Sequence, residues 1–167
     1  MTSFWVDDGA TSSWLGPLLV GVERRSDGKL EVARIGPELL LHSAEWALLV
    51  SHATQALLLR LNARVGDSVM LCRGSLFDPT GRDLSTAGFQ VQRGVITGKL
   101  QNHLAAVGRK DMLRLTGKPL GTAAEQLAWV AADPDRRLCH MRARYRHRLP
   151  VAHVEVAAAA GCLVTGD

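Results

Sequence analysis

The alternation of hydrophobic and polar residues predicts three strands before the first helix. A short apolar run over residues 3–6 indicates the first strand, and residues 16–24 and 29–35 alternate as strands with one buried face do. The Asp27-Gly28 pair between the last two favours a tight hairpin turn. Gly36-Pro37 then interrupts the third strand. The first forty residues therefore predict a strand followed by a β-hairpin.

A long helix and a buried strand are predicted after the hairpin. Apolar residues recur at helical spacing from Ser43, a suitable N-cap, to about residue 62. The run 68–72 is mostly apolar, which is typical of a parallel strand covered on both faces. The segment 80–118 is polar and rich in Gly, Asp and Thr, and we expect one helix near 99–107. Because it has too few apolar residues for a core of its own, we interpret 80–118 as an insertion.

The last part of the chain predicts a helix, a strand and a second helix. Residues 122–132 have helical periodicity and are followed by Asp133-Pro134. Residues 138–146 alternate between apolar residues and arginines, which predicts a strand, and Pro150 is suited to begin a terminal helix. The whole order predicts an α/β fold with a mixed five-stranded sheet, in which a three-stranded antiparallel meander joins parallel strands and helices cover both faces.

The composition agrees with one globular domain over residues 1–167. Hydrophobic residues make up 47% and charged residues 22%, which excludes a disordered chain. The N-terminus has no basic segment of the kind that begins a secretory signal. The three cysteines lie far apart, so we expect reduced thiols and an intracellular protein, cytoplasmic or nuclear. His140, His147 and His153 near Cys139 match no standard zinc spacing.

Positive charge is concentrated near the end of the chain. The net charge is +4, and residues 136–148 contain six arginines and no acid. The predicted strand there has Arg142, Arg144, Arg146 and Arg148 on one face. Such a stripe favours contacts with the phosphates of a nucleic acid. Charged side chains that keep an edge strand from pairing with another sheet are the alternative.

Two acids occupy positions that suit a divalent metal ion. Asp8 stands at the end of the first strand, and Glu45 begins the long helix. Clustered carboxylates are the ligands that Mg²⁺ prefers. Asp7 alternates to the other side of the strand, so we expect it to face solvent or to cap a loop. The simpler alternatives are a turn at Asp8-Gly9 and, for Glu45, a favourable interaction with the helix dipole.

The motif Asp8-Gly9-Ala10, the hairpin and Glu45 within Ser43-Ala44-Glu45-Trp46 together resemble the ribonuclease H family, in particular its ribonuclease HI-like branch. The resemblance implies the ribonuclease H-like fold and cleavage of the RNA strand of RNA/DNA hybrids with Mg²⁺ or Mn²⁺. It also implies that Asp8 and Glu45 are catalytic residues and metal ligands.

The carboxylate set that the family requires is incomplete in this chain. Gly74 occupies the place of the family's third acid, and Val154 falls closest to the place of the fourth. The candidate replacements are Asp78, one helical turn beyond Gly74, and Glu155. We therefore expect either a metal-dependent endonuclease or a catalytically inactive binding or scaffold module with the same fold. The third alternative is an unrelated α/β domain in which the acids are incidental.

Overall fold

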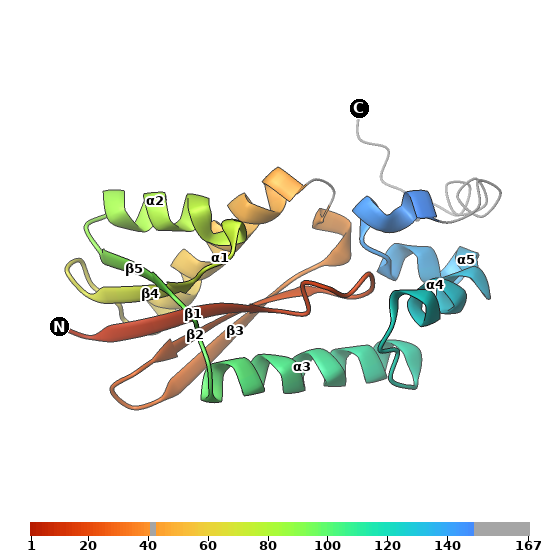
Figure 1. The fold of residues 1–167 in the computed structure, drawn as a ribbon, viewed down its shortest axis with the longest axis horizontal. Helices are drawn as coiled ribbons and strands as arrows, with labels where there is room; N and C mark the ends of the chain where they lie inside the picture. Colours follow the sequence, from red (N-terminus) through yellow and green to blue (C-terminus); the bar gives the residue numbers. More distant parts are fainter. Residues whose placement is uncertain (41–42, 149–167) are drawn as a thin grey trace.

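The computed structural model describes residues 1–40 and 43–148 and contains one mixed five-stranded sheet with helices on both faces (Figure 1). The strand order is β3-β2-β1-β4-β5. β1 pairs antiparallel with β2 and β2 with β3, whereas β4 pairs parallel with β1 and β5 pairs parallel with β4. The strands are β1 (Ser3–Gly9), β2 (Leu18–Arg24), β3 (Lys29–Ile35), β4 (Ser68–Cys72) and β5 (Gln90–Gly94). This confirms the predicted fold class.

Helices cover the two faces of the sheet unequally. α1 (Ser43–Arg60) and α2 (Asp78–Thr86) lie over one face, and α3 (Lys99–Thr116) crosses the other (Figure 1). α4 (Ala123–Ala131) and α5 (Pro134–Arg137) form a small group at one end. Four short 3-10 segments are η1 (Pro37–Leu39), η2 (Ser75–Phe77), η3 (Leu138–His140) and η4 (Ala143–Arg148). Within the described residues, no helix is both long and apolar enough to span a bilayer.

Strand β1 lies at the centre of the sheet, and its side chains alternate between two hydrophobic clusters. Phe4 and Val6 belong to the large core beneath α1, whereas Trp5 packs against the smaller cluster beneath α3. Because successive residues of a strand point to opposite faces, Asp7 continues the α3 side and Asp8 the α1 side. The alternation therefore separates the two neighbouring acids.

The region 80–118 is part of the sheet and its covering layers and is not an insertion. It supplies most of α2 and all of β5 and α3, and β5 pairs with β4. Its apolar signal is weak because β5 is an edge strand with mostly exposed residues. In α3, Leu100 and Leu104 are the buried residues. Together with Leu84 and Ile96, these residues pack the region against the sheet.

The strand predicted over 138–146 is wrong. The structure has η3 and η4 there, and only an isolated bridge joins Leu15 to Met141. Met141 and Arg142 are both fully buried, which a strand with one polar face does not permit. The terminal helix predicted from Pro150 lies outside the described residues.

Candidate metal centre at the end of strand β1

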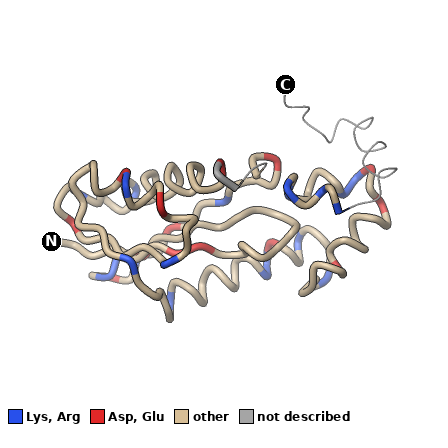
Figure 2. The backbone as a smooth tube through the Cα atoms, turned by 45° about the horizontal axis from the view of Figure 1, so that its top comes forward, with Lys and Arg blue, Asp and Glu red and all other residues tan. Residues whose placement is uncertain are grey.

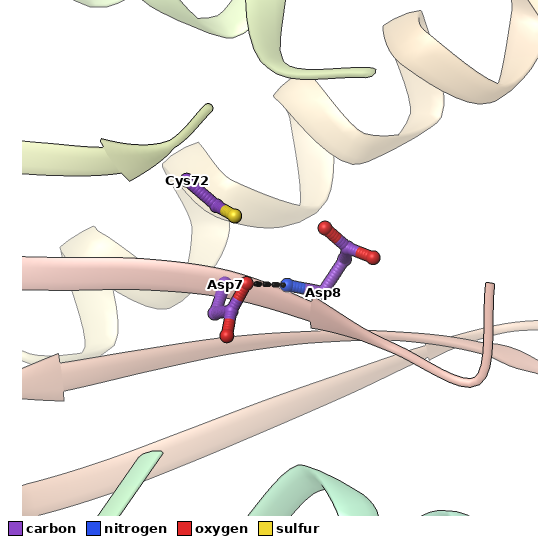
Figure 3. A group of neighbouring side chains, drawn as sticks. All are labelled: Asp7, Asp8 and Cys72. Carbon is purple, nitrogen blue, oxygen red and sulfur yellow. Dashed lines mark hydrogen bonds between the residues drawn. The ribbon is translucent and has the colours of Figure 1, made fainter. Parts of the chain in front are cut away.

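Three side chains with metal-binding donors meet where β1 and β4 end. Asp7 and Asp8 come from β1 and Cys72 from β4, and one donor atom of each lies within 4.8 Å of the others (Figure 3). Parallel neighbouring strands bring their carboxyl ends to the same edge of a sheet, which explains the meeting. In residues 1–40 and 43–148, this is the one group of three or more such donors.

Asp8 is the accessible acid of this group. Its side chain is half-buried and points away from Asp7, on the side covered by α1 (Figure 3). Burial raises the pKa of the Asp8 carboxyl, and the nearby Thr11 side chain offsets part of that rise. Asp8 is thus a half-buried carboxyl group at the end of the central strand, where a cation could be bound by its ionised form.

Asp7 is buried, with 5% of its surface exposed. Its Oδ1 accepts a hydrogen bond from the backbone N of Asp8 at 3.0 Å. Burial raises the pKa of the Asp7 carboxyl, and the neighbouring Cys72 thiol offsets only part of that rise. The expectation that Asp7 faces solvent is wrong. Asp7 pairs with Gly21 on β2, and α3 packs closely against that glycine and so covers this side of the strand.

The thiol of Cys72 lies beside the Asp7 carboxyl. Burial, followed by the contact with Asp7, raises the pKa of the Cys72 thiol above its ordinary value of 9.0. A cysteine binds a metal as the thiolate, and this thiol keeps its proton at neutral pH. The group therefore offers hard carboxylate oxygens, which fit Mg²⁺ or Mn²⁺ better than zinc.

Glu45 lies in the first turn of α1, the helix that covers the face to which Asp8 points. Its side chain is exposed, and it does not belong to the three-residue group. The next residue, Trp46, is buried in the core with 4% of its surface exposed. A metal ion shared between Asp8 and Glu45 stays a prediction.

The connection after β4 contains no acid that could replace the missing one. Gly74 has φ −61° and ψ 147°, and a Cβ there would meet no atom within 4 Å. Asp78 begins α2 and pairs with Arg93 at 2.9 Å. The same Arg93 Nη2 donates to the Gly74 carbonyl at 2.7 Å. Asp78 thus forms an ion pair with Arg93 and does not belong to the group that contains Asp8. The other candidate replacement, Glu155, lies outside the described residues.

The arginines near the end of the described chain do not all lie on the surface. Arg142 is fully buried and cannot contact a nucleic acid, so that prediction is corrected. Arg144 and Arg148 are exposed, and Arg146 is half-buried. The Arg144 guanidinium lies 5.1 Å from the centre of the Trp46 ring. Basic positions of α5 and η4 gather at the end of the molecule away from the N-terminus (Figure 2).

Sequence reasoning missed two features of this edge. Arg93 on β5 holds the connection at Gly74, but its strand was not recognised. The Asp7–Cys72 contact joins residues from two strands. Since a parallel strand was predicted at 68–72, the meeting of its carboxyl end with that of β1 was the signal that could have found this contact.

No protein-family model and no curated protein matches the sequence. Among solved structures, a chain of the complex of PCNA with ribonuclease HII from Archaeoglobus fulgidus is similar, with a TM-score of 0.62 and 17% identity, over 90% of this chain and 98% of that chain. The catalytic core domain of BIV integrase has a TM-score of 0.44 and 18% identity, over 92% and 97%. At 17% identity, the likeness to the ribonuclease HII complex shows the fold alone, which is ribonuclease H-like. The narrower ribonuclease HI-like family is not confirmed.

Proposed function

We propose that this ribonuclease H-like domain is a metal-dependent nuclease that acts on the RNA strand of RNA/DNA hybrids, with Asp8 and Glu45 as the ligands of Mg²⁺ or Mn²⁺. The observation that carries the proposal is the position of Asp8. It ends the central strand of the sheet, and its half-buried carboxylate is on the side of α1, the helix in which Glu45 stands.

The residues around Asp8 suit the binding of a cation. Burial raises the pKa of both Asp7 and Asp8, so their ionised forms lack part of the hydration that a bound cation would replace. When bound, a divalent ion supplies an activated water and neutralises charge on the phosphate. The chain's own part is to hold Asp8 at the end of β1, beside Thr11, and to keep the Asp7–Cys72 pair behind it.

The proposed site holds one ion better than two. A second ion in this chemistry depends on further carboxylates, and Gly74 provides none. Because Arg93 pairs with Asp78, the negative charge of that acid is already balanced. We therefore assign no catalytic role to Asp78 and expect slow cleavage that responds strongly to the ion concentration.

Exposed arginines supply a surface for the nucleic acid. Arg144 lies beside Trp46, which adjoins Glu45 in α1, so its charge stands next to the proposed site. Arg148 is exposed on the same short segment. Phosphate contacts of this kind weaken as salt rises, because binding releases counterions from the nucleic acid.

The second candidate is an inactive binding module with the same fold. Gly74 and the pairing of Asp78 with Arg93 favour it, because together they remove negative charge from the edge. In this case the arginine surface would bind nucleic acid, and Asp8 would support only the local structure.

A cleavage assay separates the two candidates. Labelled RNA/DNA hybrid is incubated with Mn²⁺ or Mg²⁺ and the wild-type chain, Asp8→Asn, Glu45→Gln or the control Glu38→Gln, which changes an exposed acid in η1. We expect cleavage by the wild type and the control and its loss in the other two variants. Hybrid binding without any cleavage would support the inactive module. Cleavage that survives in Asp8→Asn would refute the assignment of the site.

A further inference from the structure

Arg142 is a fully buried cation with backbone oxygens as its partners. Its guanidinium donates to carbonyl oxygens of the connection between β1 and β2: to Ala10 at 2.7 Å, Pro17 at 2.9 Å, Gly16 at 3.1 Å and Thr11 at 3.2 Å. No salt bridge found within the described part of the chain includes Arg142. Burial lowers the pKa of Arg142 to about 10, so the group remains charged at neutral pH.

These hydrogen bonds hold the whole connection between β1 and β2, because they reach four of its residues. A guanidinium carries five N–H donors in a rigid plane, and here three of its nitrogens reach four oxygens. The loop itself is held in an uncommon conformation, since Ala10 has φ of 60°. A buried charge is costly unless hydrogen bonds satisfy it, and this loop conformation supplies them. Arginine and loop therefore stabilise each other.

The clamped loop leads directly to Asp8. Ala10 is two residues beyond it, and Thr11 accepts from Arg142 with its carbonyl oxygen. The side chain of the same Thr11 stands close enough to the Asp8 carboxyl to offset part of the rise in its pKa. Arg142 thus fixes the backbone of the segment that directly follows Asp8.

Arg142 also contacts the helix that carries the second proposed ligand. Its guanidinium carbon lies 5.4 Å from the centre of the Trp46 ring. Trp46 is buried and follows Glu45 in the first turn of α1. One side chain therefore touches both segments that would supply the ligands of the metal ion.

We propose that Arg142 is a positioning residue that fixes the Asp8 loop against the first turn of α1 and thereby sets the affinity of the site for a divalent cation. The inference rests on the proposed function, because it assumes that Asp8 and Glu45 bind the ion. It gives a role to an arginine that the sequence pattern had assigned to nucleic-acid contact.

The test measures Mn²⁺ binding by electron paramagnetic resonance on the whole chain. The variants are Arg142→Lys, which keeps the charge but not the planar fork, Arg142→Met, and the control Arg114→Met, an exposed residue in the last turn of α3. Circular dichroism establishes that each variant is folded at the temperature used. Partners behind a ligand typically contribute a factor of about 10–100 to metal affinity, so we expect this loss in both Arg142 variants. The KM for the hybrid should stay unchanged, and more Mn²⁺ should restore cleavage.

A second variant, at an exposed residue, leaves the core intact and tests the loop's effect on Mn²⁺ binding even if the Arg142 variants do not fold. Thr11 is exposed, and Thr11→Val removes its hydroxyl at nearly constant shape; Ser12→Ala, also exposed, is its control in the same loop. We expect weaker Mn²⁺ binding in Thr11→Val only. If the wild type binds Mn²⁺ and the folded Arg142→Lys and Thr11→Val variants bind it equally well, the positioning role is refuted and the proposed function stands. If the wild type binds no Mn²⁺, both fail.

Discussion

Position 74 offers a direct test of whether one carboxylate is missing from this site. Gly74 follows β4 by two residues and so lies just beyond Cys72 of the three-residue group. Its backbone angles, φ −61° and ψ 147°, are open to every L-residue, and a Cβ there meets no atom within 4 Å. We predict that Gly74→Asp folds normally and binds Mn²⁺ more tightly than the wild type.

The size of the gain follows from the added charge. A carboxylate about 4 Å from a divalent ion in a medium like water contributes about 2 kcal/mol, which corresponds to roughly a thirtyfold gain in affinity. Repulsion from Asp7 and Asp8 reduces this gain, whereas the nearby Arg93 offsets some of the repulsion. Fixing a glycine in a compatible conformation adds about 0.4–1 kcal/mol to the free energy of unfolding. We therefore expect about tenfold tighter binding without loss of stability.

The matched control is Gly74→Asn, which has the same shape and no charge. Isothermal titration with Mn²⁺ compares the two variants and the wild type, and the hybrid cleavage assay is run alongside. The gain should disappear when Gly74→Asp is combined with Asp8→Asn, because the two acids would share an ion. Equal affinities in the Asp and Asn variants would show that position 74 does not face a bound cation, and the placement of the site would be refuted.

Three further predictions concern the charges and packing around the site. Burial raises the pKa of Asp7, so the folded state favours the protonated carboxyl. The stability that this protonated form contributes is lost as the pH rises above the ordinary value of 3.8. In thermal melts, the Tm of Asp7→Asn relative to the wild type should therefore increase from pH 4 to pH 7. Arg144→Gln should reduce the slope of log binding constant against log salt by about 1, as measured by fluorescence anisotropy with labelled hybrid, if Arg144 contacts a phosphate. Gly21→Ala should lower the free energy of unfolding by about 1–3 kcal/mol in urea titrations, because its Cβ would approach side-chain atoms of Leu100 and Leu104 to 2.9 Å.

The first half of the fold could be predicted because its signals are local. Strands β3 and β4 have the predicted bounds, and the turn at Asp27-Gly28 separates β2 from β3. The long helix was recognised from its apolar spacing. Each of these signals depends on residues within a few positions of one another. No knowledge of the tertiary structure was needed to read them.

The second half could not be predicted in the same way, because tertiary contacts determine it. β5 is a polar edge strand that is defined by pairing with β4. The alternation at 138–146 has the period of a strand, but Arg142 is satisfied by carbonyl oxygens more than a hundred residues away in the sequence. The burial of Asp7 likewise depends on the approach of α3 at Gly21. Local periodicity contains none of this information.

The charges along the sheet edge affect cation binding and so distinguish the metal-dependent nuclease from the inactive binding module. On one side, Asp7 and Asp8 are partly dehydrated acids, which favours binding of a cation. On the other side, Arg93 donates a hydrogen bond to the Gly74 carbonyl oxygen and forms an ion pair with Asp78. A cation bound by Asp8 would therefore be attracted from the β1 side, whereas on the β5 side Arg93 cancels the charge of Asp78 as long as that arginine is present. Arg93→Gln should then strengthen Mn²⁺ binding in an active nuclease, and an unchanged titration would indicate that no cation occupies this edge.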